Sequence, residues 1–137
     1  IREHEAESLR EPCPYHVIEL GLRYHDRETL YGRINRRVDK MVEMGLTEEV
    51  KAAREQGLTA TAAQAIGCKE LYSWLDGKET QEEALEKLKQ STRRYAKRQL
   101  TWFGTDQRMR WIEPDTLAAG ETPLDKAMEI LEKEGMA

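Results

Sequence analysis

Thr80–Phe103, TQEEALEKLKQSTRRYAKRQLTWF, carries the longest helical pattern in the sequence. Thr80 followed by Glu83 matches a capping box, a signal that starts a helix. A helix advances about 100° per residue, and on that wheel one face of the segment is apolar. We therefore predict a long amphipathic helix whose apolar face packs on a core. The residues of this face are Ala84, Leu85, Leu88, Tyr95, Trp102 and Phe103.

The other side of the same helix is cationic. Between Lys87 and Thr105 there is no acidic residue. Like charges four residues apart destabilise a helix, and a solvated face normally mixes both signs. A solvated polar face remains the alternative, but the pattern favours contact with an anion such as phosphate. The cations are Lys87, Lys89, Arg93, Arg94, Lys97 and Arg98.

Gln99 falls in the middle of the apolar face. A buried amide needs hydrogen-bond partners. Two interpretations stay open for Gln99: it satisfies a backbone group in the core, or it touches a ligand.

A second amphipathic helix is predicted from Asp26, its cap, to about Met44, with Gly45 in the C′ position. Arg37 is close in angle to Leu30 and Met41, at the edge of the core-facing stripe. A charge there is costly unless it is paired. Arg37 is therefore expected either to bind a buried carboxylate or to point into an anion site, since guanidinium suits both.

The remaining elements follow from caps, glycines and short apolar runs. Two short strands alone do not make a stable sheet, so they are interpreted as pieces of a larger one. The predictions are a strand in Tyr15–Leu22, a helix capped by Thr47 and ending at Gly57, a helix opened by Thr61 and Gln64 and interrupted by Gly67, a strand in Met109–Ile112, and a last helix begun by Thr122, Pro123 and Asp125.

Composition limits the class of protein. The 137 residues are 39% hydrophobic and 35% charged, and the net charge is -4. The charge sum alone argues against nucleic acid, but the charges are segregated, with acids concentrated from Glu113 to Glu134. No apolar run approaches the ~20 residues of a membrane span. With only Cys13 and Cys68, we expect no disulfide framework or zinc site, and a cytoplasmic location.

Four collinear stretches resemble the tRNA dimethylallyltransferase (tRNA isopentenyltransferase) family. They are Leu30–Met41 (LYGRINRRVDKM), Gly45–Val50 (GLTEEV), Gln64–Leu71 (QAIGCKEL) and Thr92–Phe103 (TRRYAKRQLTWF). The family patterns that they resemble are LYxRIxxRVDxM, GLxxEV, QAIGYKEL and TRRYAKRQLTWF. Two positions depart from the pattern: Cys68 stands where tyrosine is usual, and Gly104 stands where arginine is usual. No role is carried to either position.

The resemblance implies a mostly α chain with two short strands, the carboxy-terminal part of a P-loop-type α/β fold. No GxxxxGK[ST] motif is present in the sequence, so the P-loop and the general base of the family are expected outside it. The implied organisation is a single partial domain. Its parts are 1–14, the end of a helical insertion or linker; 15–113, the end of the α/β core with basic helices; and 114–137, a C-terminal helix.

The resemblance also implies a function. Family enzymes move a dimethylallyl group from dimethylallyl pyrophosphate to N6 of the adenosine next to the anticodon, with Mg²⁺ as cofactor. The implied partners are the tRNA anticodon stem-loop and the pyrophosphate substrate. We expect no catalytic residue and no Mg²⁺ ligand in this chain, and no activity from it alone. The candidate phosphate-binding residues are Arg37, Arg33, Arg93, Arg94, Lys97 and Arg98, and Gln99 and Trp102 are candidates for shaping the channel.

Two other interpretations remain. The basic helix is also compatible with a non-enzymatic helical module that binds RNA, or with a structural bundle whose basic face meets an acidic protein. Salt-dependent binding to tRNA but not to an acidic protein separates them.

Overall fold

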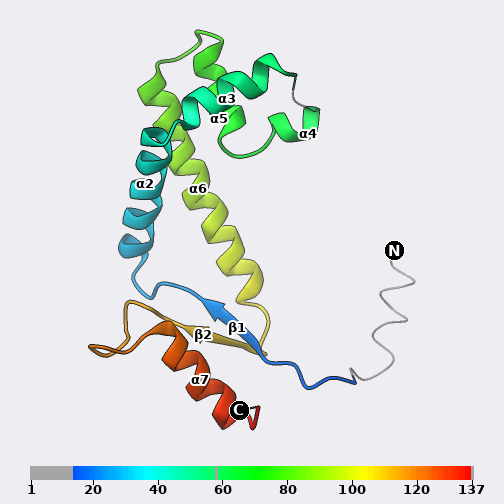
Figure 1. Ribbon diagram of the computed structural model, residues 1–137, viewed down its shortest axis with the longest axis vertical. Helices are drawn as coiled ribbons and strands as arrows, with labels where there is room; N and C mark the ends of the chain where they lie inside the picture. The colour runs from blue at the N-terminus through cyan, green and yellow to red at the C-terminus, as the bar shows by residue number, and fades with distance from the viewer. Residues whose placement is uncertain (1–13, 58, 137) are drawn as a thin grey trace.

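The computed structural model describes residues 14–57 and 59–136. Helices α2 and α6 lie side by side along the long axis, with three short helices at one end and a small sheet with α7 at the other (Figure 1). The elements are β1 (Glu19–Leu22), α2 (Arg27–Glu43), α3 (Leu46–Glu55), α4 (Ala60–Ala63), α5 (Cys68–Leu75), α6 (Gln81–Phe103), β2 (Met109–Ile112) and α7 (Pro123–Lys133).

The three predicted caps of the longer helices are confirmed. The Asp26 carboxylate accepts the backbone N–H of Thr29 at 2.8 Å and starts α2. Thr80 and Glu83 form the capping box of α6, and Thr122 starts α7 in the same way. These signals act within one turn of helix, so the local sequence is sufficient to specify them.

The predictions for the segment between α2 and α5 were wrong at two caps. Thr47 is not a cap: α3 begins at Leu46 after Gly45, and Thr47 is a buried residue inside it. Thr61 does not open a single third helix; Thr59 caps the short α4 instead. Gly67, at φ 106°, then separates α4 from α5, which agrees with the predicted interruption.

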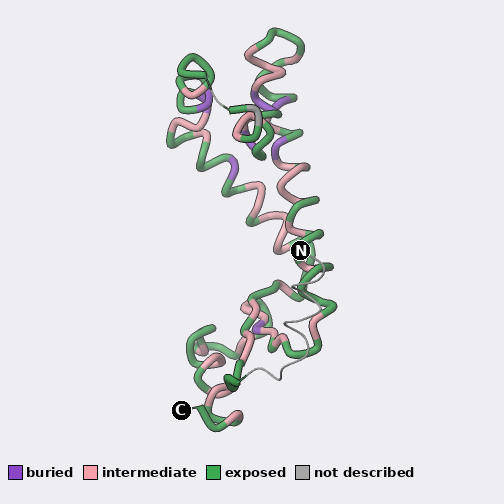
Figure 2. The backbone as a smooth tube through the Cα atoms, turned by 90° about the vertical axis from the view of Figure 1, so that its right-hand side faces the viewer, coloured by how far each residue is buried: buried purple, intermediate pink, exposed green. Residues whose placement is uncertain are grey.

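The main core lies where α3, α5 and α6 meet. Val50, Leu71 and Ala84 are its buried centre, and Leu71 is fully buried. Figure 2 shows buried positions mainly at the helical end of the molecule. Partly buried side chains surround the centre: Leu46, Cys68, Tyr72, Trp74, Leu75 and Leu85.

Polar contacts join α2 to α6 along their length. Arg93 of α6 donates to Asn35 of α2 at 2.7 Å, and its guanidinium lies 6.0 Å from the ring centre of Tyr31. Lys89 forms an ion pair with Asp39 at 2.6 Å. Two of the cations in the basic helix therefore hold the helix pair together.

The two strands are parallel neighbours, paired from Glu19 with Met109 to Leu22 with Ile112. Helix α7 packs against β2. Parallel sheets occur almost only with several strands and with both faces covered. For the described residues, the fold class is thus confirmed as mostly helical with two short strands. Among the residues described, no helix is long and apolar enough to span a membrane.

Close packing at Gly21 gives a prediction about stability. A Cβ at Gly21 would lie 2.7 Å from Trp111 Cζ3 and 2.8 Å from Met109 Sδ. We expect Gly21→Ala to lower the free energy of unfolding by about 1–3 kcal/mol, because a ring on the neighbouring strand must move. The matched control is Gly32→Ala in α2, where the nearest atom belongs to the flexible Arg36 at 3.3 Å. This control should stabilise the chain by about 0.4–1 kcal/mol. Urea unfolding measures both, and equal effects at the two glycines would contradict the packing argument.

Candidate functional site

The apolar face of α6 is covered only over its first half. Ala84 and Leu88 are buried, and α5 packs along this part of the helix. Tyr95, Trp102 and Phe103 are 45%, 76% and 46% exposed. The prediction that the whole face packs on a core is therefore wrong for the described part of the chain. The helical periodicity identified the apolar face of α6, but α5 is too short to pack against all of this face.

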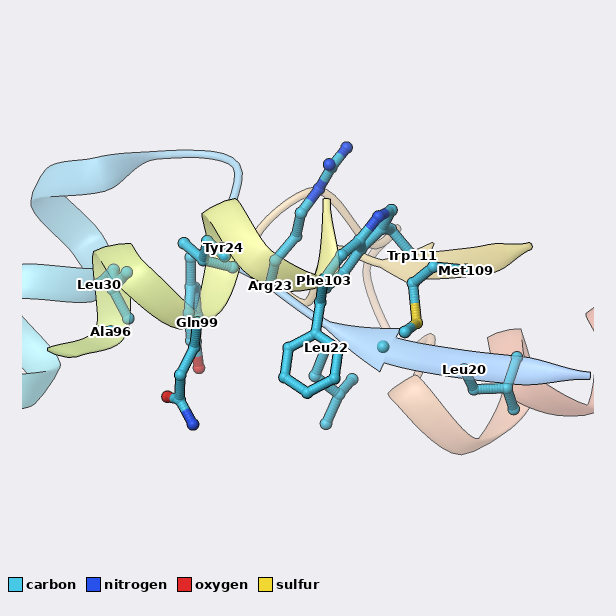
Figure 3. Close-up of a pocket in the computed structure, with 12 residues that line it drawn as sticks. Leu20, Leu22, Arg23, Tyr24, Leu30, Ala96, Gln99, Phe103, Met109 and Trp111 are labelled. Carbon is cyan, nitrogen blue, oxygen red and sulfur yellow. The ribbon is translucent and has the colours of Figure 1, made fainter. Parts of the chain in front are cut away.

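Part of this uncovered face borders an apolar cavity between α6 and β1. The cavity has a volume of about 360 Å³, and Leu20, Leu22, Gln99 and Phe103 help to line it. Figure 3 shows Gln99 and Phe103 of α6 with Leu22 of β1. Gln99 is exposed and not buried as the wheel suggested. Trp102 does not line this cavity and is 76% exposed.

The cations of α6 have different surroundings. Arg93 is half-buried, bound to Asn35 and 3.3 Å from Glu86, so its charge is already compensated. Arg98 is exposed, with its guanidinium 5.6 Å from the ring of Tyr95. Arg94 lines a shallow cavity near the ion pair of Lys87 and Glu79.

The two predicted arginines of α2 are both exposed. The Arg33 guanidinium lies 5.3 Å from the ring centre of Tyr24. Arg37 forms no hydrogen bond, ion pair or ring contact with any residue that the structure describes. The interpretation that Arg37 lies at the core edge and binds a buried carboxylate is therefore corrected. Helix α6 packs on the side of α2 that carries Tyr31, Asn35 and Val38 instead.

Lys97 is brought together with residues that the sequence analysis did not single out. It lines a cavity of about 300 Å³ with Arg27 and His25, at the carboxyl end of β1. The sequence could have pointed to His25 and Arg27 by their position. They follow a predicted strand and lie on either side of Asp26, the predicted helix cap. Arg37 lines neither this cavity nor the one at Arg94.

A carboxylate network holds the turn between β1 and α2 beside this cavity. Asp115 accepts the backbone N–H groups of His25 and Asp26 at 2.9 and 2.8 Å, and this lowers the pKa of the Asp115 carboxyl. The Thr29 hydroxyl lowers the pKa of Asp26 in the same direction. Glu113 binds Arg23 at 2.7 Å, and its other oxygen lies 3.3 Å from His25 Nδ1. The turn is therefore held by Asp26 and Asp115, whose lowered pKa keeps both carboxylates ionised at neutral pH.

The described residues contain no group of three or more histidine, cysteine, aspartate or glutamate side chains that could hold a metal ion.

Comparison with known proteins identifies the class. A family model described as IPP transferase matches residues 1–106, and the chain belongs to this family. Among curated proteins, the tRNA dimethylallyltransferase of Halalkalibacterium halodurans is 49% identical over 111 residues, covering 80% of this chain and 34% of that protein. The tRNA dimethylallyltransferase of Anoxybacillus flavithermus is 54% identical over 100 residues, covering 72% of this chain and 32% of its own length.

A solved structure extends the likeness beyond the family match. The full-length tRNA isopentenylpyrophosphate transferase from Bacillus halodurans is 43% identical, with a TM-score of 0.77 over 98% of this chain and 43% of that chain. Strand β2 and helix α7, which follow residue 106, therefore share its arrangement too. The chain spans about a third of the length of the curated relatives that it matches.

Proposed function

We propose that this chain is part of an enzyme that transfers a dimethylallyl group from dimethylallyl pyrophosphate to N6 of the adenosine next to the tRNA anticodon. The main support is the name tRNA dimethylallyltransferase, which relatives at 49% and 54% identity carry. A location in the cytoplasm is proposed with it, because tRNA is the acceptor.

The incomplete sheet supports a larger fold around the reacting centre. Within the part of the chain that the structure describes, the parallel pair of β1 and β2 has no further strands beside it, although such sheets usually have several. We propose that polypeptide outside this chain completes a P-loop-type α/β fold. The P-loop, the general base and the Mg²⁺ ligands would lie in that polypeptide. Residues 15–113 would then form the end of the α/β core, and 114–137 the C-terminal helix. The proposed linker at 1–14 lies, apart from Pro14, outside the described residues.

Within this enzyme the chain would supply binding groups and not the base. Arginine stays protonated and stabilises phosphate charge instead. Arg33, Arg37, Arg94, Lys97 and Arg98 are exposed and available to phosphate groups of the pyrophosphate or the tRNA anticodon stem-loop. Arg93 is proposed to act through the helix pair, and Gln99 and Trp102 to shape the channel.

A chimeric enzyme tests the proposal. In it, this chain replaces the matching segment of the Halalkalibacterium halodurans enzyme, and turnover is measured with dimethylallyl pyrophosphate, Mg²⁺ and tRNA. We expect the chimera to be active and the 137-residue chain alone to be inactive. A variant of the relative with the segment deleted is the control. Turnover by the chain alone would show that the centre lies within it. Salt-dependent tRNA binding with a folded but inactive chimera would favour the RNA-binding module instead.

A further inference from the structure

We propose that the cavity lined by Lys97, Arg27 and His25, called here the strand-end cavity, binds a phosphate group. It opens between the first turn of α2 and the last turns of α6, beside the turn that follows β1. Tyr24, Tyr31 and Thr101 complete the part of its wall that bears polar atoms.

The charge of the cavity is not balanced by its own walls. No aspartate or glutamate lines it. Neither Arg27 nor Lys97 forms an ion pair with any residue in the described ranges. Two cations held on one small cavity repel each other, so an anion between them lowers the energy of the arrangement.

The neighbouring acids have other partners and are not available as counter-ions. Asp26 binds Thr29 in the cap of α2. Asp115 accepts two backbone N–H groups, and Glu113 binds Arg23. The network that fixes the turn therefore leaves the charges of Arg27 and Lys97 uncompensated.

Two further guanidinium groups lie behind the aromatic walls. Arg33 lies 5.3 Å from the ring centre of Tyr24, and Arg93 lies 6.0 Å from that of Tyr31. Arg33 adds to the positive potential of the cavity, whereas the charge of Arg93 is compensated by Glu86. The place is also favourable, because open α/β sheets bind ligands outside the carboxyl ends of their parallel strands. A volume of about 300 Å³ accommodates one or two phosphate groups.

Phosphate binding in the strand-end cavity rests on the proposed function only for the molecule that supplies the phosphate group. Either the diphosphate of the prenyl donor or the backbone of the RNA carries the required chemistry. It adds Arg27 and His25 to the binding residues, and Arg37 does not line the cavity.

Binding to the 137-residue chain tests the cavity directly. Arg27→Gln and Lys97→Gln are compared with Arg36→Gln, a matched control that removes one exposed cation from α2 outside the cavity. Calorimetry with inorganic pyrophosphate is one arm. Fluorescence anisotropy with an anticodon stem-loop RNA over a salt series is the other. Circular dichroism confirms that each variant is folded.

Each outcome has a defined meaning. If the diphosphate is the source, Arg27→Gln and Lys97→Gln each weaken pyrophosphate binding about tenfold and Arg36→Gln does not. If the RNA backbone is the source, the same two variants reduce the salt slope of RNA binding by about 1 each, with pyrophosphate unaffected. Equal behaviour of all three variants in both arms, or no binding of either probe, overturns the proposal. An inactive chimera with intact binding at this cavity would reject the enzyme function and keep the cavity.

Discussion

Leu71→Ala is expected to lower the free energy of unfolding by about 2–5 kcal/mol. Leu71 is fully buried where α5 meets α3 and α6, next to Val50 and Ala84. Removing its methyl groups loses transfer energy and leaves a cavity that its neighbours fill only in part. Because small domains are stable by roughly 5–15 kcal/mol, this loss is a large fraction of the total.

The control for this prediction has the same chemistry at the surface. Leu124 in α7 is 69% exposed, and Leu124→Ala should change stability by about 0.5 kcal/mol or less. Urea unfolding followed by circular dichroism measures both variants. Similar midpoints for the two would mean that the helical end is not the core of the chain.

Arg37→Ala in the chimeric enzyme is expected to raise the KM for dimethylallyl pyrophosphate about tenfold or more, and the KM for tRNA much less. Arg37 is exposed and has no partner among the residues that the structure describes, so its guanidinium is free to bind a ligand. A bidentate guanidinium–phosphate contact would be lost with the side chain.

Its neighbour Arg36 provides the comparison, because Arg36→Ala removes the same charge from the same helix one residue earlier. Steady-state kinetics with each substrate varied in turn separates the two KM values. An effect confined to tRNA would assign Arg37 to the RNA surface, and equal effects of both variants would point to charge alone.

The sequence alone determined the helices with strong local signals, the two strands and the resemblance to the family. Asp26, Thr80 and Thr122 were identified as caps because a cap requires only residues within one turn. Thr47 was mistaken for a cap because its side chain is buried inside α3, and burial depends on residues distant in sequence.

Only the tertiary structure shows which cations are already bound to other residues and which are available to bind a ligand. The sequence presents Arg93 and Lys97 as equivalent cations one turn apart, yet Arg93 binds Asn35 across the helix pair while Lys97 faces the strand-end cavity. Periodicity in the sequence identifies the apolar face of a helix, but it does not identify which element packs against that face. The packing of elements far apart along the chain decides this, and in α6 it buries Leu88 and leaves Tyr95 and Trp102 exposed.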